Sequence, residues 1–372
     1  MKNEVISERQ AVILIILFII GSTFLAGAGG HAKQDAWIAI IIAMTWSIIL
    51  LLIFSRILSL FPGKDLFDIL QILMGKFLCK LISILMIWFA FHDGALILRT
   101  LSDFTSTLVF DETPVAVPII FFTILLIWCS KEGIEVLGRW SEFFIWVVIL
   151  IFLTISILAI PQMDISRLKP ILNNGVTPIL KGAFSSFSYP LGETVIFTMV
   201  FSNISKVKNY KRTFIIGLLI GGGLIVLSTL RNILILGSNS ISRVYFPTTL
   251  AISLIHLGEL LERLEMLVVI IFLVCIFVKV SICIIAVCNG ISKVFGFDDY
   301  KFITTPVTLL MLSFSFFAYK SIMEMSFWTS NIWPYYSFVF EVIIPLIIFV
   351  VAEIRSKILS STSVTTGNKG LW

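Results

Sequence analysis

Charge is what this chain has least of. Only 13% of its 372 residues are Asp, Glu, Lys or Arg, whereas 58% are apolar, and the mean hydropathy is +1.06. An ordinary soluble protein has about a quarter of its residues charged. The shortage argues against a cytosolic enzyme, a nucleic-acid-binding protein and a disordered scaffold, since each needs a large polar surface. Lipid is therefore the expected solvent for most of the chain.

Sequence signatures of catalysis and metal binding are also missing. The chain has three histidines, no phosphate-loop motif and no His-Glu-x-x-His sequence. Its five cysteines lie in or beside apolar runs and lack Cys-x-x-Cys spacing, so we expect buried free thiols and not a disulfide or zinc framework. We therefore expect a protein that is not an enzyme and needs no cofactor.

Long apolar runs are what the chain has in quantity. A helix needs roughly 20 mostly apolar residues to cross a bilayer, and ten runs approach or exceed that length. Six carry no charge, namely Ala11–Gly30, Ala36–Ser55, Thr113–Ser130, Phe143–Met163, Thr213–Leu230 and Phe302–Tyr319. Four include ionisable residues, namely Leu78–Leu108, Thr177–Ser205, Glu262–Ser292 and Trp333–Ile354. The pattern predicts an all-α integral membrane protein with about ten transmembrane helices.

The positions of lysine and arginine predict the orientation in the membrane. With the N-terminus in the cytoplasm, the cytoplasmic segments hold 17 of these residues and the outer segments hold 7, as the positive-inside rule requires. Both termini are then cytoplasmic. Residues 1–356 form one transmembrane domain, and 357–372 form a polar cytoplasmic tail. Aromatic residues at the span ends, among them Trp333 and Tyr319, are expected in the interfacial belts.

Helix-breaking residues interrupt the first and the sixth run. The first contains Gly21-Ser22-Thr23, and the sixth contains the stretch from Ser188 to Glu193, with Pro190 and Gly192 inside it. A proline removes a backbone donor and a glycine permits an unwound turn, so backbone groups lose their partners at membrane depth. Close packing of helices through small residues is the alternative explanation.

Breaks at matching places predict two inverted repeats of five helices, about 8–163 and 170–356. Such breaks mark a substrate site at the midplane, where helix ends present N–H groups to an anion and C=O groups to a cation. An amino-acid zwitterion has both charges. We therefore predict ligand contacts at the residues of the two breaks: Gly21, Ser22, Thr23, Ser188, Tyr189, Gly192 and Glu193.

Ionisable residues inside the spans are costly and should face the protein interior. Glu193 is either a ligand or proton group, or a structural carboxylate at a frayed helix end. Lys279 could replace a bound sodium ion or pair with a carboxylate. Asp93 lies in one run with His92, Arg99 and Asp103, and this group could serve a proton or water pathway or form a structural ion pair. Glu341 is central in the tenth run and needs a partner. Lys279, Asp93 and Glu341 are thus candidate ion or coupling residues, whereas Arg231 is expected to reach the interface.

Motifs along the whole chain resemble those of endospore germination permeases, the B subunits of spore germinant receptors. The stretches that carry the resemblance are Ile6–Gln10, Ile20–Ser22, Gln34–Trp37, Gly175, Pro178–Gly182, Tyr189–Glu193, Tyr245–Pro247, Glu259–Glu265 and Phe277–Ser281. The resemblance implies the 5+5 inverted-repeat fold of the amino acid–polyamine–organocation superfamily.

The same resemblance implies a function and partners. Such subunits sense small germinants in the inner membrane of a dormant spore, together with a larger A subunit and a lipoprotein C subunit. Whether the ligand also crosses the membrane stays open. The competing hypotheses are an autonomous amino-acid transporter of the same fold and a structural anchor for partner subunits.

Overall fold

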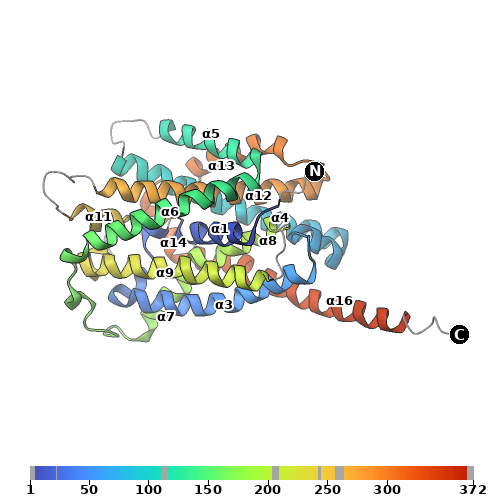
Figure 1. The fold of residues 1–372 in the computed structure, drawn as a ribbon, viewed down its shortest axis with the longest axis horizontal. Coiled ribbons are helices and arrows are strands. Elements are labelled where there is room, and N and C mark those ends of the chain that lie inside the picture. The colour runs from blue at the N-terminus through green and yellow to red at the C-terminus, as the bar shows by residue number, and fades with distance from the viewer. Residues whose placement is uncertain are drawn as a thin grey trace.

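A computed structural model describes residues 5–21, 23–109, 116–202, 209–241, 244–255 and 264–366 (Figure 1). Every regular element within these ranges is helical. The long helices are α3 (Ala36–Leu60), α4 (Leu66–Phe104), α6 (Ile134–Leu158), α9 (Tyr210–Leu236), α12 (Glu265–Phe295) and α16 (Ile344–Thr366). The shorter ones are α1 (Glu8–Ile20), α2 (Thr23–Ala26), α5 (Ala116–Glu132), α7 (Val176–Ser186), α8 (Phe197–Val200), α10 (Ser238–Ile241), α11 (Pro247–Ser253), α13 (Lys301–Phe317), α14 (Ile322–Asn331) and α15 (Trp333–Phe338).

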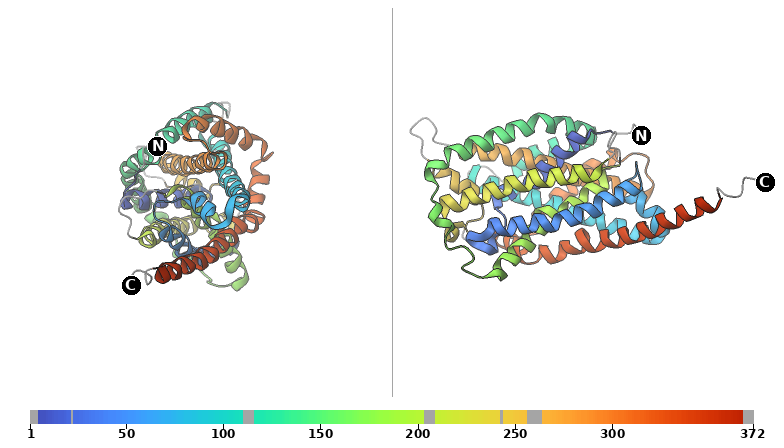
Figure 2. Two further views of the ribbon diagram at one scale, coloured as in Figure 1. Left: turned by 90° about the vertical axis from the view of Figure 1, so that its right-hand side faces the viewer. Right: turned by 60° about the horizontal axis from the view of Figure 1, so that its bottom comes forward.

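The long helices run side by side along one axis of an elongated bundle (Figures 1 and 2). Seven described helical segments are long and apolar enough to cross a membrane, and α13 with α14 form a further pair bent by 101°. The chain is therefore a multi-pass, all-α membrane protein, as predicted. Each of the ten predicted runs coincides with a helix or a broken helix. The count of ten spans and the inverted repeat stay predictions.

The two ends of the chain lie at the same end of the bundle, where α1 begins and α16 ends (Figure 2). α16 continues to Thr366, so the first part of the expected polar tail is helical. α4 begins at Leu66, twelve residues before the predicted start at Leu78. It bends at Gly75, whose φ of 71° favours glycine, and the bend lets an additional short helix precede the span.

α1 and α12 occupy the interior of the bundle. About three-quarters of each apolar segment is buried (76% and 78%), compared with 28% for α6, which faces outward. Glycines on α9 let α1 approach closely: a Cβ atom at Gly217 would lie 2.5 Å from Ile15, and one at Gly221 would lie 3.1 Å from Ile19. The central position of α1 places its break in the middle of the molecule.

Candidate functional site

The first span is broken halfway through the bundle. α1 ends at Ile20, Gly21 has φ 28° and ψ −132°, and the helix resumes at Thr23 in α2. A side chain at Gly21 would place its Cβ 2.7 Å from the carbonyl oxygen of Phe18 and 2.8 Å from Cδ of Lys279. The turn therefore requires glycine. Ser22, a predicted ligand residue, lies outside the described residues.

The sixth span is broken as well. α7 ends at Ser186, and the following turn, Phe187–Leu191, leaves helical geometry at Tyr189 (φ −132°, ψ 110°) before Pro190. Gly192–Ile196 then leads into α8. The predicted interruptions of spans 1 and 6 are thus both confirmed, and their helix-breaking residues are the physical cause.

A fully buried ion pair lies between the two breaks. Lys279 Nζ of α12 donates to Glu193 Oε2 at 2.5 Å, and both side chains are 0% exposed. The ammonium also lies 5.0 Å from the ring centroid of Phe18 and 4.8 Å from that of Tyr189. The carboxylate and the two ring faces replace water around the ammonium. Lys279 therefore faces the interior near both breaks, as expected.

A second carboxyl group adjoins this pair. Cys283 Sγ, one turn beyond Lys279 on α12, donates to Asp93 Oδ2 at 3.6 Å. The Asp93 carboxyl also lies close to that of Glu193, whose partner Lys279 is one helical turn from Cys283. Oδ1 of Asp93 and Oε1 of Glu193 accept no hydrogen bond from any donor among the described residues. The structural ion pair expected in this part of α4 does form, but between Arg99 and Asp103 at 3.1 Å and not at Asp93.

The fourth member of the cluster is Glu341. It lies in a π-helical turn, Val339–Ile343, between α15 and α16, and is 0% exposed. Neither of its oxygens has a hydrogen bond of ordinary geometry among the described residues, although the Ser337 hydroxyl, one turn earlier, lies close by. Its carboxyl packs against Gly192 so tightly that a Cβ atom there would collide with it. Gly192 therefore makes room for Glu341.

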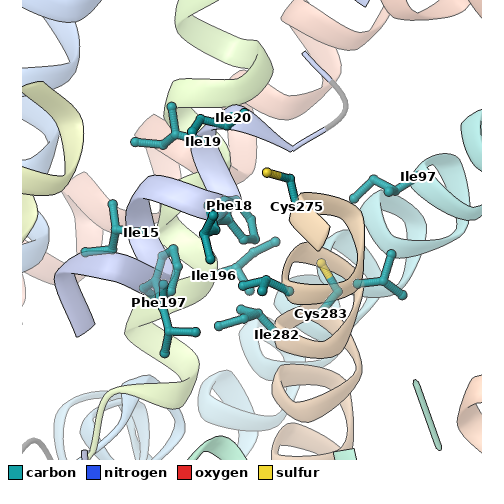
Figure 3. Close-up of a cluster of buried hydrophobic side chains, with 14 of the residues drawn as sticks. Ile15, Phe18, Ile19, Ile20, Ile97, Ile196, Phe197, Cys275, Ile282 and Cys283 are labelled. Atoms are coloured by element: carbon teal, nitrogen blue, oxygen red, sulfur yellow. The ribbon is translucent and has the colours of Figure 1, made fainter. Parts of the chain in front are cut away.

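The walls of this cluster are apolar. Figure 3 shows Phe18 of α1 near Ile196 and Phe197 of the sixth span, with Ile282 and Cys283 of α12 beside them. The rings of Phe18 and Phe197 are 5.0 Å apart in an edge-to-face arrangement. Such surroundings keep the effective dielectric constant low, so each unpaired charge inside them is costly.

A cavity of about 450 Å³ lies among the segment after α2, the last turns of α4 and α14. Its lining comes from the segment after α2, from α4, from the turn in the sixth span and from α14, and includes Gly27, Thr100, Asp103, Tyr189, Ser330 and Trp333. The ring of Tyr189 is shared: it lines the cavity and also covers the Lys279 ammonium. The cavity and the charge cluster are thus neighbours across one aromatic ring.

Most of the predicted ligand residues do not line this cavity. Among the described ones only Tyr189 lines it, whereas Gly21, Thr23, Ser188, Gly192 and Glu193 are buried. Ser188 Oγ donates to the Pro334 carbonyl at 3.2 Å, and Thr23 Oγ1 has no partner among the described residues. Contact of these residues with a ligand stays a prediction.

Three sequence expectations for large side chains were wrong. Trp333 and Tyr319 do not lie in an interfacial belt: they are 1% and 6% exposed, and Trp333 stacks on Phe89. Arg231 does not reach the interface either. It is 2% exposed, donates to Ser228 at 3.1 Å and lies over two phenylalanine rings. Tertiary packing, invisible in a hydropathy pattern, encloses all three.

Sequence reasoning also missed the contribution of α14 to the cavity. Met325, Thr329 and Ser330 line the cavity because α14 is bent sharply against α13. The one signal in the sequence was a cluster of small polar residues between two apolar runs, Thr329–Asn331. It would not have distinguished a cavity wall from an ordinary loop.

Comparison with known sequences now adds to this geometry. Residues 5–324 match the sequence model of the family described as "Spore germination protein". The chain belongs to this spore germination protein family. Family membership confirms the resemblance inferred from the motifs, and it extends over the helices that supply Asp93, Glu193 and Lys279.

Individual spore germination proteins are similar in sequence to this chain over most of their lengths. Spore germination protein KB of Bacillus subtilis (strain 168) is 29% identical over 361 residues, which cover 96% of this chain and 97% of that protein. Spore germination protein YndE of the same organism is 24% identical over 299 residues, covering 78% of this chain and 81% of that protein.

A solved structure shows the same fold. Mhp1, a nucleobase-cation-symport-1 family transporter in a closed conformation with bromovinylhydantoin bound, superposes with a TM-score of 0.68 over 87% of this chain and 74% of its own. The two sequences are only 12% identical, so the likeness concerns the fold alone. This family member is therefore built on a transporter architecture.

Proposed function

We propose that this chain is the membrane subunit of a spore germinant receptor, located in the spore inner membrane with both termini cytoplasmic. It binds a small germinant, most simply an amino acid, between the broken first and sixth spans and signals germination. Family membership supports the process, and the transporter fold supports a small-molecule site near the midplane. The expected partners are the larger A subunit and the lipoprotein C subunit.

The observation that carries this proposal is the double contact of Tyr189. A molecule at the floor of the cavity would touch the same ring that covers the Lys279 ammonium. Displacing the ring would open the cavity toward Gly21, Thr23, Ser188, Gly192 and Glu193, where the broken helices offer oriented N–H and C=O groups. Ligand binding would then reach the coupling residues Lys279, Asp93 and Glu341.

Tyr189→Ala and Tyr189→Phe spores test this proposal. Alanine removes the ring, so we expect at least about a tenfold rise in the germinant concentration needed for half-maximal germination. Phenylalanine keeps the ring and should respond much like the wild type. Tyr335→Ala is the matched control, since Tyr335 is 70% exposed on the outer face. Receptor-independent germination must stay intact in all variants. A wild-type germinant dependence in Tyr189→Ala would show that the ligand binds elsewhere.

The transporter fold favours a second candidate, an autonomous amino-acid transporter. Uptake of a labelled amino acid by vesicles containing this chain alone would support it. Co-purification with both partner subunits, without uptake by the isolated chain, would support the receptor.

A further inference from the structure

The contact between Asp93 and Glu193 brings two acceptors together. An ionised carboxylate only accepts hydrogen bonds, yet these two carboxyl groups lie close together, bonded to Lys279 and Cys283 on successive turns of α12, and each keeps one oxygen without a donor among the described residues. Both residues are buried, at 1% and 0% exposure, so bulk water does not screen their charges. Two carboxyl groups in such contact are stable when one proton lies between them.

The ammonium cannot satisfy the whole cluster. Lys279 supplies one positive charge and donates to one oxygen of Glu193, while the remaining neighbours of its Nζ include the two aromatic rings. Three carboxylates would therefore leave a net charge of −2 in an apolar interior, where unpaired charge is strongly disfavoured. Two further positive charges are required.

A metal ion fits this requirement poorly. The described residues contain no group of three or more His, Cys, Asp or Glu side chains arranged to hold a metal. Lys279 Nζ already occupies Glu193 Oε2 at 2.5 Å, and the third carboxyl, Glu341, is packed against Gly192 on another segment. Protons need no such coordination sphere.

We propose that Asp93 and Glu193 share one proton and that Glu341 holds a second, so that the cluster is a proton-binding site with Lys279 as its fixed cation. The cluster is then neutral, since the singly charged Asp93–Glu193 pair balances the ammonium. Release of a proton to water leaves a carboxylate behind and requires no electron transfer. The proposal does not depend on germinant binding.

The fold explains why these protons stay in place. The charged or titratable groups around the shared proton are Lys279 and Cys283 from α12, Glu341 from the π-helical turn, Tyr189 from the sixth span and Tyr336 from α15. Tyr189 both covers the Lys279 ammonium and lines the cavity, so its ring lies between the cluster and a space large enough for water. Proton exchange should therefore depend on movement of the Tyr189 ring.

Infrared spectroscopy of the full-length protein in lipid, without germinant, tests the proposal. Protonated carboxyl groups have a C=O stretching band distinct from that of carboxylates, and the band shifts in D₂O. We expect this band at neutral pH in the wild type. Asp93→Asn should remove one component and Glu341→Gln another. Glu353→Gln is the matched control, because Glu353 is ion-paired with Arg56 and should contribute nothing to the band.

The outcomes distinguish protons from a metal cation at the carboxyl cluster. Loss of one component in each cluster variant, with Glu353→Gln unchanged, supports the two protons. No protonated-carboxyl band in the wild type at neutral pH overturns the proposal, as does a band that disappears on addition of sodium or potassium ions, which would identify a metal-cation site. The wild-type spectrum decides between these even if a variant fails to fold. Its result is also independent of whether Tyr189 variants respond to germinant.

Discussion

Lys279 contacts both helix breaks and the two rings that cover its ammonium. Its aliphatic stem fills the space beside Gly21, its ammonium pairs with Glu193, and its charge is covered by Phe18 and Tyr189. One side chain thus joins the break of span 1 to the break of span 6. A change at Lys279 should affect stability and signalling together.

The Lys279–Glu193 pair should show strong coupling in stability. Lys279→Met or Glu193→Gln alone leaves one buried group without its partner, which costs about 3–5 kcal/mol. The double variant removes both charges, so it should be more stable than either single variant. Denaturation of purified protein in detergent measures this order, and both single variants should lose the germinant response. If the double variant loses as much unfolding free energy as the two single variants lose together, the two residues are not coupled.

Gly192 should tolerate no side chain. Gly192→Ala places a methyl group where the Glu341 carboxyl lies, so we expect a loss of about 1–3 kcal/mol in stability and a loss of the germinant response. Gly223→Ala is the matched control, because a Cβ atom there meets nothing within 4 Å. In the helix α9 that change should be neutral or stabilising by up to about 1 kcal/mol. A Gly192→Ala protein as stable as Gly223→Ala would contradict this packing.

At the scale of elements, α4 is anchored at the end of the bundle where the chain begins and ends. Asp65 precedes α4 and caps it, accepting from the Asp68 N–H at 3.0 Å and from Asn289 Nδ2 of α12 at 2.9 Å. Burial and the nearby Asp68 charge raise the pKa of Asp65, although Lys293 and these hydrogen bonds oppose the shift. The cap therefore links α4 to α12, the two helices that supply Asp93 and Lys279.

The raised pKa of Asp65 predicts a pH dependence. A carboxyl with a raised folded-state pKa contributes stability below its unfolded pKa and loses it as the pH rises through the folded pKa. The Asp65→Asn variant cannot ionise at this position and keeps a good capping residue. As the pH rises from the unfolded-state pKa of Asp65 through its folded-state pKa, the unfolding free energy of the variant should therefore increase relative to that of the wild type. Denaturation at a series of pH values measures the difference.

A control of opposite sign is available in the connection after α6. The Ser166 hydroxyl and backbone N–H lower the pKa of Asp164, so its contribution is present above the unfolded pKa and lost as the pH falls. Asp164→Asn should therefore lose relative stability as the pH rises. The same slope for both variants would contradict the assignment for Asp65.

At the scale of the whole molecule, the bundle has an apolar exterior and a charged centre. Large side chains such as Phe143, Trp146 and Leu150 on α6 are more than 60% exposed, which suits contact with lipid. The four ionisable groups of the cluster are at most 1% exposed. This arrangement is the reverse of a soluble protein and follows from the solvent.

The orientation can be tested by labelling engineered cysteines with a membrane-impermeant maleimide. Asn173→Cys, between α6 and α7, should react in intact cells, whereas Asp299→Cys, between α12 and α13, should react only after permeabilisation. Both positions are exposed. Cys79 is half-buried and could react with the label, so it should first be replaced by serine. The other four cysteines are buried and can be kept. The reverse pattern of labelling would place the termini outside.

Particular residues show how far the sequence could predict the site. Pro190 and Gly21 predict the two breaks, because proline and glycine change the backbone conformation at their own positions, whatever the tertiary structure. Glu341 was recognised as a residue in need of a partner, yet its position against Gly192 could not be foreseen, since the two are about 150 positions apart. Trp333 was misplaced because a hydropathy pattern does not tell an interfacial aromatic residue from a buried one.

The amino-acid sequence was sufficient to predict the lipid solvent, the helical class, the approximate spans and the places where two helices break. These depend on composition, run length and local backbone chemistry. The packed helices were needed to show that Lys279 pairs with Glu193, that Asp93 lies close to Glu193, and that the Tyr189 ring lies between this cluster and the cavity. The reason is that these contacts join residues from helices far apart in the chain, whose rotation and depth are set by packing between helices and not by any one of them.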